Sequence, residues 1–301
     1  MGIHHWKKNS RSEYFAFNVH NGNLTSRVLQ HSCCTIVDIE DAYDELILHK
    51  STFGHGLHVY NCSTGQMSSI ASEPLMSSKR YYSLVYDLSI QKYKVVCFCL
   101  IKNMIKCYIC VLDSNDEVNE NVVWRKLSLS FQVIFPTYPI TYFDRVVCNG
   151  PLNWIVESIE ESEEDMVAFV LSIDISSEKL RERTELPCKP NICYMEMFKC
   201  KLLAFDGVLC YANPTSFDEF DFWVLRHWIK PIWIKQHTLH LSSMICKLEH
   251  LRSFICDDFL PLAIYQCNKS CSAEILILHC HKLFIYNVTS QELRSNVVKE
   301  D

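Results

Sequence analysis

The sequence predicts an all-β fold, and three observations support this class. Short apolar runs alternate with polar segments from Tyr14 onward, whereas long helical periodicity is scarce. Asn149-Gly150 and Asp206-Gly207 each lie between apolar arms, a strong hairpin signal because both central residues of a type I′ turn need positive φ. Strand ends are repeatedly followed by Asn or Asp and a small polar segment, since these side chains accept a backbone hydrogen bond that starts a turn. The pattern recurs at Asn18, Asn61, Asp87, Asp113, Asp174 and Asn287.

Many short strands with recurrent turns predict a β-propeller-like arrangement of antiparallel strands. At about 40–45 residues per four-stranded blade, a chain of 301 residues holds about six to seven blades. A β-sandwich is the alternative, but it would need an unusually large core or two domains. No linker rich in proline or glycine divides the chain. We therefore expect a short N-terminal tail at residues 1–13 and one propeller-like domain at residues 14–298.

Composition narrows the class of partner and the compartment. A net charge of -6 argues against a nucleic-acid surface, and a hydrophobic content of 49% excludes wholesale disorder. Neither a signal-peptide core nor an apolar run of membrane-spanning length is present in the sequence. Many of the 17 cysteines lie in apolar runs such as 95–100, where a reduced cysteine acts as a small buried hydrophobe. The expected location is the reducing cytoplasm or the nucleus, without a membrane partner.

The order of the motifs resembles the F-box-associated domain of the large plant family of F-box proteins. The resemblance covers roughly residues 14–298. Short segments at matching places along the chain carry it: Val59-Tyr60-Asn61, Leu84-Val85-Tyr86-Asp87, Tyr93-Lys94-Val95-Val96, Trp124-Arg125, Asn149-Gly150 with Trp154, Ile173-Asp174, Glu185-Leu186-Pro187, Phe222-Trp223-Val224-Leu225, Trp233-Ile234-Lys235 and Tyr286-Asn287.

The resemblance implies a propeller-like domain that selects protein substrates for a cullin-type ubiquitin ligase. In that family an N-terminal F-box of three helices binds the Skp-type adaptor. Residues 1–13 carry no Leu-Pro-rich helical motif, so we expect this chain not to recruit the adaptor by the usual route. An unknown protein substrate is therefore the expected partner. A propeller enzyme, a hydrolase or sugar-active protein, is the alternative, and a cluster of His, Asp and Glu in the central channel would favour it.

The residues singled out are structural, with one exception. Trp228 lies beside Arg226, His227 and Lys230 and is a candidate binding anchor, because aromatic residues are enriched at interface hot spots. The structural signature consists of Asn149, Gly150, Trp154, Asp206, Gly207, Trp124 and Trp233.

Two groups of cysteine and histidine could in principle bind zinc. The first is Cys97-x-Cys99 with Cys107-x-x-Cys110, but residues three apart in a strand point to opposite faces. The second combines Cys267 and Cys271 with the run 279–281, and it requires that neighbouring strands pair. No nucleophile elbow, phosphate loop or paired-carboxylate motif is present in the sequence. The acidic run 160–165 is expected to form a solvated loop. No catalytic residue, metal or cofactor is expected.

Overall fold

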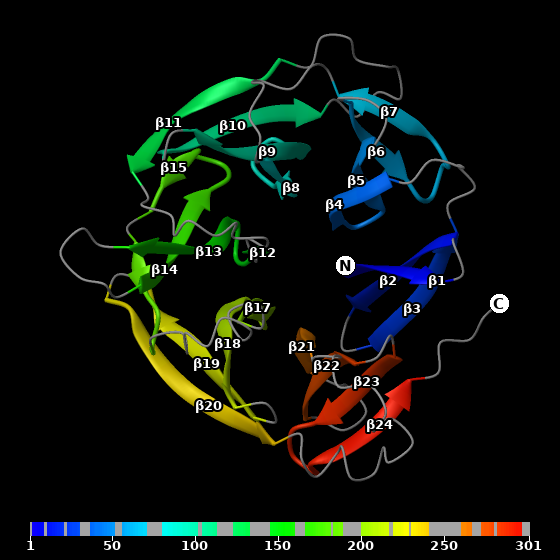
Figure 1. Cartoon of the computed structure of the whole chain (residues 1–301), viewed down its shortest axis with the longest axis vertical. Coiled ribbons are helices and arrows are strands. Elements are labelled where there is room, and N and C mark those ends of the chain that lie inside the picture. The colour runs from blue at the N-terminus through cyan, green and yellow to red at the C-terminus, as the bar shows by residue number, and fades with distance from the viewer. Residues whose placement is uncertain are drawn as a thin grey trace.

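The chain folds into a ring of β-sheets (Figure 1). The computed structural model describes residues 2–8, 11–20, 23–30, 37–51, 56–70, 80–101, 104–112, 123–132, 145–159, 166–181, 183–188, 200–216, 219–228, 230–240, 260–266, 272–279 and 282–296. Every regular element in these ranges is a strand. The predicted all-β propeller architecture is therefore confirmed.

Sheets 1 to 3 follow one another along the chain. Sheet 1 contains β1 (Gly2–Lys8), β2 (Arg11–His20) and β3 (Asn23–Gln30). Sheet 2 contains β4 (Val37–Tyr43), β5 (Leu46–Ser51), β6 (Leu57–Asn61) and β7 (Met67–Ile70). Sheet 3 contains β8 (Arg80–Asp87), β9 (Lys92–Ile101), β10 (Met104–Leu112) and β11 (Arg125–Gln132).

Sheets 4 to 6 complete the ring. Sheet 4 contains β12 (Arg145–Val147), β13 (Pro151–Ile159) and β14 (Met166–Asp174), and both β15 (Lys179–Leu180) and β16 (Thr184–Glu185) pair with β14. Sheet 5 contains β17 (Lys201–Phe205), β18 (Val208–Ser216), β19 (Glu219–His227) and β20 (Ile232–His240). Sheet 6 contains β21 (Leu260–Gln266), β22 (Ala273–His279), β23 (Lys282–Asn287) and β24 (Glu292–Asn296).

Full blades number five in the described part of the chain, fewer than the six to seven blades predicted from chain length. Among the described residues, five sheets have four or five strands and sheet 1 has three. In sheets 2 to 6 the first strand lies nearest the centre of the ring (Figure 1). First strands of neighbouring sheets contact one another, as β4 contacts β8 and β17 contacts β21. The first strands therefore form the wall of the central channel.

One face of the ring carries the tight turns. Each sheet is an antiparallel meander, so the turn after its first strand and the turn after its third strand lie at the same end. Hydrogen bonds at this end of the sheets join sheet 2 to sheet 3, sheet 3 to sheet 4 and sheet 4 to sheet 5. We call this side of sheets 2 to 5 the turn face, made by the turns at residues 44–45, 62–65, 88–91, 149–150, 175–178 and 206–207.

Four of the predicted Asn or Asp turns have the expected geometry. The Oδ1 atom of the first residue accepts a backbone hydrogen bond from inside the loop, for example from Ser63 to Asn61 (2.9 Å) and from Ser89 to Asp87 (2.9 Å). Each of these loops has four residues and ends in positive φ, at Gly65, Gln91, Glu178 and Gln291. Asn18 lies inside β2, two residues before its end, and Asp113 is outside the described residues.

The two predicted hairpins have the positive φ angles that their sequences require. Asn149 and Gly150 have φ of 52° and 97°, and Asp206 and Gly207 have 49° and 70°. The strands on either side pair across these two-residue loops. Both turns therefore have the left-handed backbone that Asn, Asp and Gly tolerate best.

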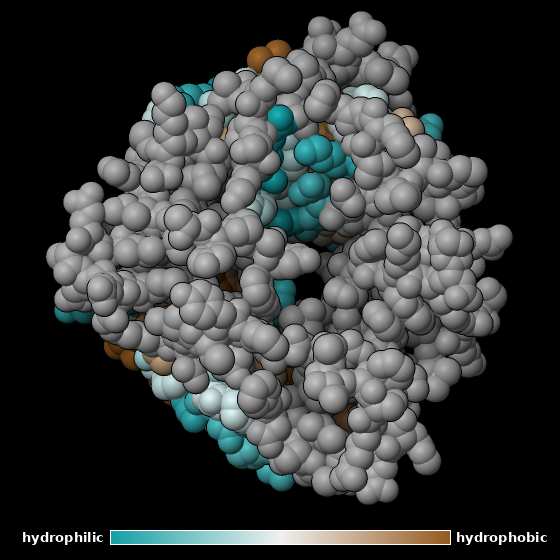
Figure 2. All heavy atoms as spheres, viewed as in Figure 1, coloured by the Kyte–Doolittle hydropathy of each residue, from teal (hydrophilic) through white to brown (hydrophobic). Residues whose placement is uncertain are grey.

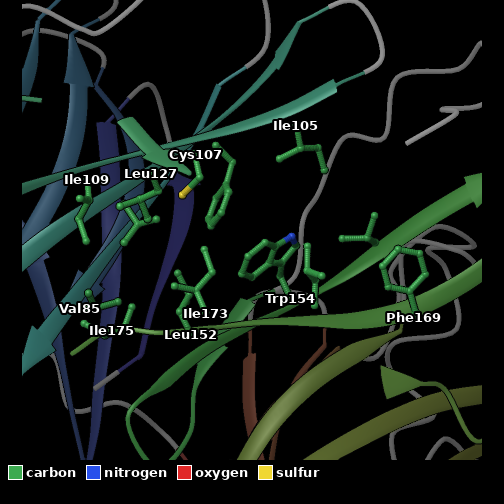
Figure 3. Close-up of a cluster of buried hydrophobic side chains, with 14 residues drawn as sticks. Val85, Ile105, Cys107, Ile109, Leu127, Leu152, Trp154, Phe169, Ile173 and Ile175 are labelled. Carbon is green, nitrogen blue, oxygen red and sulfur yellow. The ribbon is translucent and has the colours of Figure 1, made fainter. Parts of the chain in front are cut away.

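Among the described residues, apolar cores fill the spaces between consecutive sheets from sheet 2 to sheet 6, so sheets 3, 4 and 5 are buried on both faces. In β9, Val95 and Cys97 pack toward sheet 2, whereas Val96 and Phe98 pack toward sheet 4. This explains why the segment 95–100 is continuously apolar instead of alternating with polar residues. Figure 3 shows the core between sheets 3 and 4, into which Trp154 points from β13. Trp154 is 2% exposed, and its ring lies 4.3 Å from that of Phe98.

One predicted boundary is wrong. Residues 1–13 were expected to be a tail, but Gly2–Lys8 form β1, and β2 begins at Arg11. The segment is rich in polar residues and has no apolar run, so it lacks the signal that identifies a strand by hydrophobic pattern. Backbone pairing with β2 forms this strand. Among the described residues, no helix has the length and apolarity that crossing a bilayer requires.

Candidate protein-binding face

A buried lysine is at the centre of the turn face between sheets 3 and 4. Lys94, in β9, is 2% exposed, and its Nζ atom lies 2.6 Å from Asp87 Oδ2 and 2.9 Å from Glu178 Oε1. It also donates a hydrogen bond to the backbone oxygen of Ile175 (2.9 Å). Because a buried ammonium group is costly unless it is paired and hydrogen-bonded, these three acceptors make the position tolerable.

Further contacts extend this network across the two sheets. Arg125 approaches Glu178 with both terminal nitrogens, at 2.6 Å and 2.8 Å, in the bidentate geometry that guanidinium groups favour. The hydroxyl groups of Ser89 and Ser176 both donate to Asp87 Oδ1, at 2.6 Å and 2.9 Å. The turns at 88–91 and 175–178 are therefore tied together, and we call this junction the 3–4 seam.

The electrostatics of the 3–4 seam favour charged carboxylates. Burial acts to raise the pKa of Asp87, but hydrogen bonds from Lys94, Ser89 and Ser176 outweigh it, so the pKa lies below its usual range. The pKa of Glu178 is also lowered, because Arg125 and Lys94 outweigh the effect of burial. Both groups are therefore anionic at neutral pH, which matches the two cations that face them.

Exposed apolar side chains surround the 3–4 seam. Leu88 and Ile90, in the turn after β8, are 77% and 47% exposed, and Val123, just before β11, is 77% exposed. All three lie at the turn end of sheet 3, Leu88 and Ile90 after its innermost strand β8 and Val123 before its outermost strand β11, and we call them the apolar patch. The other exposed large apolar residues among the described residues are Met67, Ile232 and Ile234. Leu88 and Ile90 share one loop, and exposed apolar groups on a rigid surface are typical of protein-binding sites.

Four of the signature residues form a second junction, the 4–5 seam. The Asn149 side-chain amide donates to the backbone oxygen of Gly207, and Cys148 Sγ lies 3.3 Å from the same oxygen. Gly150 and Asp206 complete the two turns that face each other here. A Cβ atom at position 207 would lie 2.7 Å from Asn149 Oδ1, so a larger residue there would displace the Asn149 side chain from this contact. Neutral groups alone make these contacts.

The tryptophans singled out in the sequence lie at junctions between sheets. Trp124 is half-buried and packs beside Tyr82, with ring centroids 6.3 Å apart. Trp233 donates its indole N–H to the backbone oxygen of Glu185 (2.8 Å), linking sheets 5 and 4. Trp228, the candidate anchor, is half-buried, and the Arg181 guanidinium carbon lies 5.7 Å from its ring centroid. The ring is thus partly covered by its own protein.

The channel wall contains an ion pair between distant strands. Asp41, in β4, accepts hydrogen bonds from the backbone nitrogens of Ala42 (2.8 Å) and Leu84 (2.9 Å), and its Oδ2 lies 3.3 Å from Arg145 Nε. Asp41 therefore joins the first strands of sheets 2, 3 and 4. Figure 2 shows hydrophilic residues within an opening of the molecule, where Figure 1 places β4, β5, β8 and β9.

The cysteines of the first zinc candidate do not converge on one point. Cys97, Cys99 and Cys110 belong to the core between sheets 2 and 3, whereas Cys107 belongs to the core between sheets 3 and 4. Cys97 and Cys99 Sγ atoms lie 3.5 Å apart, and burial raises the pKa of the Cys110 thiol to about 12. Among the described residues, no group of three or more His, Cys, Asp or Glu is placed to hold a metal ion. In the second candidate, Cys267, Cys271, Cys280 and His281 lie outside the described residues.

The sequence did not predict that Lys94, Glu178 and the apolar patch belong to one site. A lysine within the apolar segment 93–100 was the available signal, because a charge inside a strand buried on both faces needs a partner. Asp87 is close in sequence, but Ile175 and Glu178 lie in a turn more than 80 positions away, and pairing at that distance depends on how sheets 3 and 4 meet, not on local spacing.

Comparison with known proteins identifies the domain type. The family described as F-box associated beta propeller domain matches residues 7–295. No curated protein matches the chain at a significant level. Among solved structures, a nidogen/laminin complex has a TM-score of 0.46 at 9% identity, with 99% of this chain and 93% of that chain covered. An α-L-arabinanase of Penicillium chrysogenum with arabinobiose has a TM-score of 0.46 at 8% identity, with coverage of 83% and 76%. The α-L-arabinofuranosidase of Lactobacillus brevis has a TM-score of 0.41 at 10% identity, with coverage of 88% and 91%.

Proposed function

Because the chain belongs to the F-box-associated β-propeller family, we propose that it recognises a protein substrate for a Skp–cullin–F-box type ubiquitin ligase. The single observation that carries this proposal is the family match over residues 7–295. The exposed apolar patch on a hydrogen-bonded turn face supports it, since interfaces concentrate binding energy in apolar groups on preorganised surfaces. The setting that the family implies is a plant cell, and the free thiols of the described part suit the cytoplasm or nucleus.

We propose that recruitment of the Skp-type adaptor needs an F-box and is separate from the propeller. An F-box presents a helical apolar surface, and the described residues of this chain form strands only. Residues 1–301 alone should therefore bind a substrate without binding the adaptor above background. Fusion of an F-box to the N-terminus should add adaptor binding and leave substrate binding unchanged, because domains are separate folding units.

The experiment is affinity capture from plant-cell extract followed by mass spectrometry. Residues 1–301 and the F-box fusion are used as parallel baits, and a captured substrate should be more ubiquitinated with the fusion than with the chain alone. Stoichiometric capture of the adaptor by residues 1–301 would show that this division of labour is wrong. Failure to capture any protein with either bait would overturn the recognition function itself.

The alternative of a propeller enzyme has no specific observation in its favour. Asp41, the described carboxylate that joins three first strands, is occupied by the backbone of Ala42 and Leu84 and by Arg145. These are structural contacts of the channel wall. We therefore propose a binding module without a catalytic step.

A further inference from the structure

The turn at 88–91 differs from its three counterparts in what it exposes. In the turns that follow Asn61, Asp174 and Asn287, the first loop residue is half-buried or buried, and the third is Thr or Ser. In the turn that follows Asp87 these two positions are Leu88 and Ile90, and both are exposed. The shared backbone geometry does not require apolar residues there. Their presence at a solvent-facing position therefore points to a use outside the fold.

The place of this turn in its sheet is also unusual. It follows the first strand of sheet 3, whereas the equivalent turns of sheets 2, 4 and 5 are two-residue loops at 44–45, 149–150 and 206–207. The loop 88–91 is two residues longer, so it extends farther from the end of its sheet. It therefore presents Leu88 and Ile90 near the mouth of the channel, in a position that a partner can reach.

The loop is held in one conformation from both sides. Asp87 Oδ1 accepts hydrogen bonds from the backbone and hydroxyl of Ser89, which stands between Leu88 and Ile90, and from Ser176 of sheet 4. Asp87 Oδ2 is held by Lys94. Binding through a preorganised loop avoids much of the entropy that ordering would cost. The buried ion pairs thus support the exposed apolar groups.

Among the described residues, exposed charge is cationic on the sheet 4 side of the patch and anionic on the sheet 2 side, where Asp44 and Glu45 are exposed; the whole chain carries a net charge of -6. Arg125 is 58% exposed, Lys179 is exposed and Lys92 is half-exposed. The carboxylates at the seam are turned inward, with Asp87 1% and Glu178 15% exposed. Asp44 lies on the sheet 2 side, where it accepts a hydrogen bond from Tyr93 (3.4 Å). The side toward sheet 4 therefore favours an anionic partner.

We infer that the apolar patch binds a peptide segment of the partner protein in which large apolar side chains stand next to Asp or Glu. This inference rests on the proposed recognition function and names its binding surface. Leu88, Ile90 and Val123 contact the apolar side chains of the segment, and Lys179, Lys92 and the outer edge of Arg125 attract its carboxylates. Charge complementarity of this kind mainly accelerates association and selects among partners.

The test is a selection of random 12-residue peptides displayed on phage, with residues 1–301 immobilised as the target. Selected peptides should combine Leu, Ile, Phe or Trp with Asp or Glu. Their affinity, measured by fluorescence anisotropy, should fall by about 30-fold in Leu88→Ser/Ile90→Ser, as for loss of hot-spot contacts. Lys179→Glu should weaken binding by about three- to tenfold and reduce its salt dependence. These side chains are exposed, so the variants should keep the wild-type melting temperature.

Ile232→Ser/Ile234→Ser is the matched control, because it removes two exposed apolar residues from sheet 5. It should leave peptide binding unchanged. Selected peptides that bind wild type and Leu88→Ser/Ile90→Ser equally, or that are basic, would overturn the assignment of this surface, as would the absence of any enrichment. If extract proteins are still captured in that case, the recognition function stands and only the surface is wrong.

Discussion

The 3–4 seam and the 4–5 seam join neighbouring sheets at the same face by different chemistry. At the 3–4 seam the buried Lys94 is paired with Asp87 and Glu178. At the 4–5 seam the Asn149 amide and the Cys148 thiol meet the backbone oxygen of Gly207. A charged junction needs both of its charged partners, because removing one leaves the other as a buried, uncompensated charge. A neutral junction depends instead on close approach of the backbone. The two seams should therefore respond differently to substitution and to pH.

The largest effects are expected at the 3–4 seam. Lys94→Met keeps the length of the side chain but removes the positive charge, leaving Asp87 buried without its ion-pair partner. We expect a loss of about 3–5 kcal/mol in the free energy of unfolding, as for one partner of a buried pair. Urea denaturation followed by circular dichroism measures it. Lys179→Met, at the exposed start of β15, is the control, and an equal loss in both variants would contradict a special role for Lys94.

The core behind the same seam provides a comparison of similar size. Trp154→Ala should cost about 3–5 kcal/mol, because the buried ring leaves a cavity beside Phe98. Trp154→Phe should restore part of this loss, since a smaller aromatic ring fills some of the space. Thermal and urea unfolding of the three proteins give the values. A melting temperature unchanged in Trp154→Ala would mean that this core adds little to stability.

Acid should weaken the 3–4 seam and leave the 4–5 seam unaffected. The folded-state pKa values of Asp87 and Glu178 are lowered, so below about pH 4, where free carboxyl groups gain protons, the unfolded chain binds more protons than the folded one. Stability from these groups is therefore present above that pH and is lost as the pH falls toward the folded-state values. The urea midpoint should fall between pH 5 and pH 3. The fall should be smaller in Asp87→Asn/Lys94→Met, and an equal fall would assign the acid sensitivity to other groups.

Glycine substitutions separate backbone strain from crowding at the 4–5 seam. Gly207→Ala adds a Cβ atom at positive φ and against Asn149, whereas Gly150→Ala adds one at positive φ in open space. Both should cost about 1–3 kcal/mol for the strained backbone, with Gly207→Ala the more costly. Urea unfolding of both variants is the measurement. If Gly150→Ala is more destabilised than Gly207→Ala, crowding by Asn149 does not contribute to the cost at position 207.

The smallest effect is expected from the side-chain amide itself. Asn149→Gly keeps a residue that tolerates positive φ and removes the hydrogen bond to Gly207. It should cost about 0.5–1.5 kcal/mol, the usual net value of one hydrogen bond. In this background Gly207→Ala should be less damaging than in the wild type, because the crowding atom is gone. Strict additivity of the two substitutions in urea unfolding would exclude contact between these positions as the cause.

Local patterns predicted the strand class and the turns, and contacts across the ring could not be predicted in the same way. Asn149-Gly150 specifies its hairpin because the φ requirement is contained in two residues. The polar strand β1 escaped detection because no hydrophobic pattern marks it. Leu88 occupies the same loop position as Ile175, and only the exposure of Leu88 distinguishes the two residues. The pairing of Lys94 with Glu178 depends on how the sheets meet around the ring.

Burial of both strand faces has a consequence for how the chain finds its register. In a sheet with one wet face, a slip of one residue moves apolar side chains into water, and this penalty rejects the error. In β9 such a slip would only exchange Val95 and Val96 between two dry cores. Hydrophobicity therefore discriminates poorly between the correct and slipped alignments of these strands. The ends of the strands therefore select the correct alignment, because an Asn or Asp side chain, a residue with left-handed backbone or a buried charge fits only that alignment.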